Sequence, residues 1–177
     1  MLKGHVVDLE LMDRAELPVL REWETDPEFM GEYEPLEQST IASLEKIFDG
    51  KGDSQWYFVR RKDGTRVGYI CHFETSGCRG IGYVLLRSEW GKGFGTEAVQ
   101  LMVDYLFLKK DIVRIQAETH PDNLASQRVL EKAGFVKEGI RRRAFFSRGV
   151  WRDTALWSII REDWKAPRLL PLGHVGK

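Results

Sequence analysis

The chain has 177 residues, of which 42% are hydrophobic, and this is enough apolar material for the core of one ordinary domain. Its 27 basic residues equal its 27 acidic residues, so no net field attracts nucleic acid or an anionic membrane surface. A local basic patch could still attract either, so the charge balance does not decide the partner; we expect no membrane partner and do not favour a nucleic-acid partner. The composition predicts a single domain over residues 1–165, followed by a C-terminal tail at 166–177 in which prolines and glycines disfavour regular structure.

Neither the cysteines nor the N-terminal residues indicate an exported or metal-dependent protein. Cys71 and Cys78 lie seven positions apart, without the spacing of a zinc site or a disulfide framework, and the four histidines are scattered. The first residues lack the apolar stretch of a signal peptide, and no run approaches the ~20 apolar residues of a membrane span. We expect no metal and a cytoplasmic location.

The predicted elements mix strands and helices along the chain. Alternating or β-rich runs predict strands at residues 5–11, 55–61, 66–73, 80–86, 112–119, 135–140 and 151–160. Apolar residues at helical spacing predict a helix that opens at Asp13, a second at 41–48 ended by Gly50, a third after residue 96, and a fourth at 123–133. This order is neither all hairpins nor strict alternation, so it favours an α+β or mixed α/β sheet with helices on both faces.

The turn from Trp90 to Thr96 is the most informative stretch, because three glycines lie where the hydrophobic period changes from 2 to 3.6. Glycines let successive backbone N–H groups point at one anion, and the start of a helix adds positive potential. The spacing differs from the phosphate loop of kinases and from the dinucleotide fingerprint, which argues against both classes. The turn predicts a site for a phosphorylated cofactor, although by itself it also fits a connection that binds nothing.

A second motif, N-x-x-S-x-x-x-L-E-K-x-G-F, occupies residues 123–135. Together with W-G-K-G-F-G-T-E-A at residues 90–98, it resembles the GNAT acetyltransferases, specifically the branch with Rim-type ribosomal-protein N-terminal acetyltransferases and spermidine acetyltransferases. The resemblance implies the GNAT fold, a central mixed, mostly antiparallel and splayed sheet of about six or seven strands with helices on both faces. It also implies an acyl-CoA-dependent N-acetyltransferase that uses acetyl-CoA.

The same resemblance implies where coenzyme A binds. Its pyrophosphate would lie on the main-chain amides of Gly91, Lys92, Gly93, Phe94, Gly95 and Thr96. The strand residues Tyr83, Val84 and Leu85 would pair their backbone with the pantetheine arm, which Asn123 would also contact. Trp90 stands where the wider family has Gln or Arg, and this departure has little bearing on binding through amides.

For catalysis, many family members place a tyrosine acid seven residues after the helix asparagine, but that position here is Leu130. Ser126 is the remaining candidate for a proton donor to the departing thiolate; its alternative is an ordinary hydroxyl bonded to a helical carbonyl. Glu118 or His120, at the end of the preceding strand, could act as general base, directly or through water. His72 and Glu74 are weaker alternatives, and the amine could also arrive already neutral.

The acceptor stays open between several amines. Trp23, Tyr33 and Glu34 lie where the resemblance places the acceptor wall, and carboxylates with aromatic rings suit a cationic amine. A protein N-terminal α-amine is favoured, with a polyamine or an aminoglycoside as alternatives, and a non-catalytic coenzyme A-binding module is the alternative from another class. Residues 141–143, three arginines, could contact RNA or form a solvated strand edge. Relatives are commonly dimers, so a homodimer is compatible.

Overall fold

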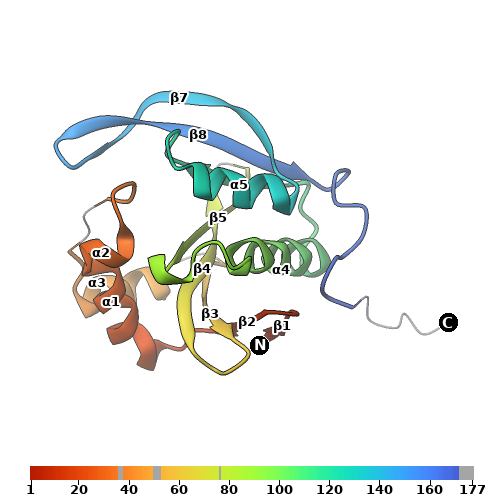
Figure 1. Cartoon of the computed structure of the whole chain (residues 1–177), viewed down its shortest axis with the longest axis horizontal. Helices are drawn as coiled ribbons and strands as arrows, with labels where there is room; N and C mark the ends of the chain where they lie inside the picture. The colour runs from red at the N-terminus through yellow and green to blue at the C-terminus, as the bar shows by residue number, and fades with distance from the viewer. Residues whose placement is uncertain (36–37, 50–52, 76, 172–177) are drawn as a thin grey trace.

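The structure, a computed structural model, describes residues 1–35, 38–49, 53–75 and 77–171 (Figure 1). The strands among them form one eight-stranded sheet in the order β1-β2-β3-β4-β5-β6-β8-β7. Neighbouring strands are antiparallel except β5 and β6, which are parallel. Their bounds are β1 (Leu2–Lys3), β2 (Val7–Leu11), β3 (Gln55–Arg61), β4 (Arg66–Thr75), β5 (Cys78–Leu85), β6 (Arg114–Thr119), β7 (Val136–Ser147) and β8 (Val150–Ile160).

Helices cover both faces of this sheet. The α-helices of the described residues are α1 (Leu17–Thr25), α2 (Pro27–Met30), α3 (Ile41–Phe48), α4 (Phe94–Lys109) and α5 (Leu124–Ala133). Because consecutive strand residues point to opposite faces, Phe58 packs with residues of α1 to α3, whereas Val59 packs with residues of α4 and α5. This confirms the expected mixed α/β sheet with helices on both faces. Over the described ranges, none of the helices is long and apolar enough to cross a membrane.

The observed secondary structure differs from the sequence prediction in three places. The sheet has one strand more than the expected six or seven, because the two-residue β1 pairs with β2. The chain forms a separate helix, α2, after the break at Asp26, whose side chain accepts a hydrogen bond from the Glu28 amide at 2.9 Å. Strand β7 extends beyond residue 140 through an irregular register near Arg143, where φ is +47°. Gly50, the predicted end of α3, lies outside the described residues.

The sheet opens between β5 and β6. Their parallel pairing covers only Arg79 to Ile81 on β5, opposite Ile115 to Ala117 on β6. Past this point β5 continues beside β4 as far as Leu85, while β6 continues beside β8 as far as Thr119. In the part of the chain that the structure describes, residues 82–85 of β5 therefore have no strand partner on the β6 side. Their backbone N–H and C=O groups on that side can pair with a ligand.

The segment after β8 packs against α4. The Asp104 carboxylate, almost fully buried, accepts hydrogen bonds from Trp164 Nε1 at 2.8 Å and from the amides of Arg168 at 2.8 Å and Leu169 at 2.7 Å. Residues 165–171 contain neither helix nor strand, yet these bonds hold them on the domain. The segment therefore supports the helix that begins at the glycine turn.

Candidate functional site

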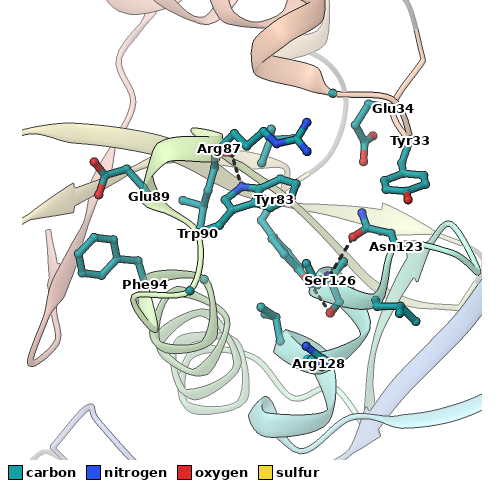
Figure 2. Close-up of a pocket in the computed structure, with 18 of the residues that line it drawn as sticks. Tyr33, Glu34, Tyr83, Arg87, Glu89, Trp90, Phe94, Asn123, Ser126 and Arg128 are labelled. Carbon is teal, nitrogen blue, oxygen red and sulfur yellow. Dashed lines mark hydrogen bonds between the residues drawn. The ribbon is translucent and has the colours of Figure 1, made fainter.

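A cavity of about 530 Å³ lies at the opening between β5 and β6 (Figure 2). Four segments surround it: β5, the glycine turn before α4, the start of α5, and the loop after α2. The residues that the sequence predicted for binding and that line the cavity are Tyr33, Glu34, Tyr83, Val84, Leu85, Gly91, Gly93, Phe94, Gly95, Thr96, Asn123 and Ser126. Segments far apart in the chain thus meet at one cavity.

The glycine turn leaves open space at the N-terminus of α4. Gly91 and Gly93 have φ values of +77° and +85°, a left-handed backbone that glycine adopts without strain. A Cβ at either position would meet no protein atom within 4 Å, and no side chain caps the helix. The first amides of α4 therefore stay available to an anion. Gly95 serves packing as well, because a Cβ there would lie 3.1 Å from Leu85 and 3.3 Å from Val129.

Side chains next to the turn hold it and add positive charge. Trp90 Nε1 donates to the Leu85 carbonyl at 2.9 Å, which ties the turn to the end of β5. Lys92 does not line the cavity, and its ammonium pairs at 3.0 Å with Glu89, which does. Three cations that the sequence analysis missed do line it, namely Arg87, Arg128 and Lys132. The spacing of four between Arg128 and Lys132 placed them on one face of α5, but nothing in it indicated that this face meets the glycine turn.

A pair of hydroxyls lies on the wall between β5 and α5. The Tyr83 phenol lies 2.8 Å from Ser126 Oγ and donates to the Ser126 carbonyl at 3.2 Å. Burial raises the pKa of Tyr83 above its ordinary value, so the phenol stays protonated and able to donate. Asn123 caps α5, and its Oδ1 accepts from the Ser126 amide at 3.0 Å. Leu130, at the usual tyrosine position, is fully buried in the core. The sequence predicted a role for the Tyr83 backbone and missed its side chain.

The loop after α2 supplies the facing wall. Figure 2 shows the Tyr33 and Glu34 side chains pointing from this loop toward Asn123. Burial raises the pKa of the Glu34 carboxyl above its ordinary value, because the cavity wall removes solvent from it. The Tyr33 ring stacks on His120, with ring centroids 5.0 Å apart. His120 thus supports the wall from behind, and its Nδ1 accepts a hydrogen bond from the Asp122 amide at 3.2 Å.

Other predicted residues lie away from the cavity. Trp23 stacks on Phe29 at 4.8 Å in the core beneath α1 to α3, so it supports the wall rather than forming it. Glu118 does not line the cavity, and its carboxylate on β6 forms an ion pair at 2.6 Å with Arg141 of β7, across the intervening strand β8. His72 is fully buried, and burial lowers its pKa to about 4. The structure thus brings neither Trp23 nor Glu118 to the site.

The sequence matches known acetyltransferases. A family model described as Acetyltransferase (GNAT) domain matches residues 7–136, and the chain belongs to this family. The probable N-acetyltransferase YjcK of Bacillus subtilis (strain 168) is 51% identical over 83 residues, which are 47% of this chain and 46% of that protein. The chain thus matches about half the length of that relative. An aminoglycoside N(6')-acetyltransferase type 1 of Klebsiella pneumoniae is 30% identical over 154 residues, 75% of each protein.

Solved structures match the fold over nearly the whole chain. The spermidine N-acetyltransferase of Vibrio cholerae, solved with CoA and spermine, has a TM-score of 0.78 and 19% identity over 89% of this chain and 97% of that one. RimJ of Mycobacterium smegmatis, solved with CoA-disulfide, has a TM-score of 0.77 and 24% identity over 91% of this chain and 85% of that one. Both confirm the GNAT fold, and the expected Rim-type and spermidine acetyltransferases are among these neighbours.

Proposed function

We propose that the protein transfers an acetyl group from acetyl-CoA to a primary amine by direct attack. The observation that carries this proposal is the single cavity in which a glycine turn with free amides, the Tyr83–Ser126 hydroxyl pair and the Glu34 carboxyl meet. Acetyl-CoA supplies an activated acetyl thioester. The residues of this chain have to bind it, orient the amine and move the protons.

The glycine turn fits the anionic part of coenzyme A. The free amides at residues 91–96 suit the pyrophosphate, and the open space beside Gly91 and Gly93 allows a close approach. Arg87, Arg128 and Lys132 line the same cavity and supply charge for phosphate groups. Residues 82–85 have no strand partner on the β6 side, so their backbone groups other than the Leu85 carbonyl, which accepts from Trp90, suit the amides of the pantetheine arm, with Asn123 beside it.

The role of each reacting group follows from the wall of the cavity on which it lies. Glu34 would bind the ammonium form of the acceptor, and its raised pKa brings the carboxyl closer to accepting a proton from it. His120, behind Tyr33, is the second candidate for this base, ahead of Glu118 with its Arg141 partner. Ser126 would give its hydroxyl proton to the departing sulfur and regain a proton from water, while the Tyr83 phenol, which stays protonated, would hold the serine oxygen in place by a hydrogen bond.

The acceptor we favour is a protein N-terminal α-amine, in keeping with the Rim-type resemblance. A polyamine or an aminoglycoside is the second candidate, and one observation favours it: Glu28, Glu32 and Glu34 all line the cavity, which suits an acceptor with several cationic groups. The 30% identity to an aminoglycoside acetyltransferase also supports this candidate.

An acceptor screen tests the proposal. The protein is mixed with acetyl-CoA and, in separate reactions, with peptides of varied N-termini, polyamines or aminoglycosides, while thiol release and the mass of the amine are followed. We expect amine-dependent thiol release and a product heavier by one acetyl group. Binding of coenzyme A without turnover on any of these amines would instead support the non-catalytic module.

A further inference from the structure

The tip of the β7–β8 hairpin reaches over the loop after α2 (Figure 1). There Arg148 Nη2 donates to the Gly31 carbonyl at 2.7 Å, and Arg148 Nε donates to the Glu34 carbonyl at 3.4 Å. One guanidinium thus holds both ends of the segment that carries Tyr33 and Glu34, across sequence separations of 117 and 114 residues. Its planar fork suits two carbonyls better than the single ammonium of lysine would.

The backbone at Arg148 is unfavourable for an arginine. Ser147 pairs with Val150, so Arg148 and Gly149 form a two-residue hairpin turn, and their φ values are +50° and +80°. Such turns favour Asn, Asp or Gly at the first position, because a left-handed backbone brings a larger side chain's Cβ close to the following carbonyl. Hairpin formation alone therefore does not explain an arginine there. The contacts of its guanidinium do.

The segment that Arg148 holds contributes to the lining of two cavities. Residues 31–34 all line the site cavity. A second cavity of about 560 Å³, lined by Gly31, Glu32 and Arg148 among others, lies against the same segment. A loop that borders open space has fewer packing contacts than a buried segment, so specific bonds have to hold its position. The bonds from Arg148 and the stacking of Tyr33 on His120 are such contacts.

We propose that Arg148 is a positioning residue that holds the acceptor wall and thereby sets the affinity for the acceptor. It does not line the site cavity, so it acts through the carbonyls of Gly31 and Glu34 on the Tyr33 and Glu34 side chains. The inference rests on the proposed function, because it assumes that this wall binds the amine. We therefore expect a change at the β7–β8 turn to weaken binding of the acceptor and to leave binding of the cofactor unchanged.

The test is Arg148→Asn. Asparagine tolerates the left-handed backbone, and Asn-Gly is a favoured pair for this turn, so the hairpin and the thermal midpoint should be maintained or improved. The asparagine side chain is too short to reach both carbonyls. We expect the KM for the acceptor to rise about 10-fold, the scale of one lost charge-assisted hydrogen bond, while the KM for acetyl-CoA stays within about twofold. Arg148→Lys should fall between wild type and Arg148→Asn.

Arg142→Asn is the matched control, because it removes the same charge from an exposed position on β7. It should leave both KM values unchanged. An acceptor KM that stays at the wild-type value in Arg148→Asn would overturn the proposal. So would an equal rise in Arg142→Asn, which would indicate a general charge effect.

Hydrogen exchange separates this inference from the proposed function. In the free protein, amides of residues 28–35 should exchange faster in Arg148→Asn than in wild type, whether or not an acceptor is known. Unchanged exchange there would overturn the positioning role. Faster exchange in a protein that acetylates no amine would keep the positioning role and contradict the proposed function instead.

Discussion

The two halves of the proposed site, one for the cofactor and one for the acceptor, are built in different ways. The cofactor half consists of main-chain amides at one turn, and the helix behind it is held by fully buried residues such as Val99, Leu101 and Met102. The acceptor half consists of side chains on a loop, held by a hairpin tip more than a hundred residues further along the chain. A short stretch of sequence therefore determines the first, whereas the second depends on long-range contacts and can change without disturbing the first.

The largest effect is expected for Gly93→Val, which should weaken coenzyme A binding at least about 100-fold in calorimetry. The valine would obstruct a phosphate and cannot easily adopt a φ of +85°. Gly77→Val is the matched control, because Gly77 has a φ of +75° and equally open surroundings in the turn between β4 and β5. If both variants bind coenzyme A as wild type does, the pyrophosphate is not at this turn.

Ser126→Ala should lower kcat about 100-fold, within the range of general acid catalysis, and leave the affinity for coenzyme A nearly unchanged. Tyr83→Phe keeps the ring but removes the hydroxyl behind Ser126, so a smaller loss of about 10-fold is expected. Single-turnover rates of acetyl transfer measure both. Full turnover in Ser126→Ala, with the acetyl step limiting, would remove Ser126 from the proton path.

Glu34→Gln addresses the acceptor half alone. We expect kcat/KM for a cationic amine to fall about 10-fold, with the KM for acetyl-CoA unchanged. Because burial raises the pKa of Glu34, activity in the wild type should be lost as pH falls through a value above the 4.5 of an ordinary Glu carboxyl. This acid limb should be absent from the pH profile of Glu34→Gln. Its persistence would assign the limb to another group.

The smallest effect is expected on the pH dependence of the free energy of unfolding, through a histidine in the sheet beneath the cofactor half. His72 lies near Tyr105 of α4, with ring centroids 6.3 Å apart, and burial lowers its pKa to about 4. As pH falls from 6.5 toward 4, the unfolded chain takes up a proton that folded His72 does not, so the protein loses stability. The loss should be about 1 kcal/mol between pH 7 and 5.5, and Gln in its place should flatten this slope. Equal slopes in chemical denaturation would contradict it.

Most residues of the proposed cofactor half can be picked out from the sequence alone. The change of period at the glycine turn and the Asn123 cap are local features, so both could be recognised without knowing the fold. The sequence predicted the acceptor half poorly. Glu118 forms an ion pair with Arg141 because β6, β8 and β7 lie in that order in the sheet, and this order is not encoded in the sequence around either residue.

The same limit applies to the contacts that complete the site. Tyr83 and Ser126 are 43 residues apart in the chain, and their hydroxyls meet only because β5 and α5 lie side by side. The Arg148 contact depends likewise on how far β7 extends beyond the predicted residue 140. Each requires the three-dimensional arrangement, which single-sequence patterns do not supply.

A crystal structure with bound acetyl-CoA and an unreactive amine would test the two-part site most directly. We predict pyrophosphate oxygens within hydrogen-bond distance of the amides at residues 91–96, the sulfur next to Ser126 Oγ, and the amine beside Glu34. A pyrophosphate bound away from the glycine turn, or an amine bound on the Glu118 side of β6, would contradict this prediction.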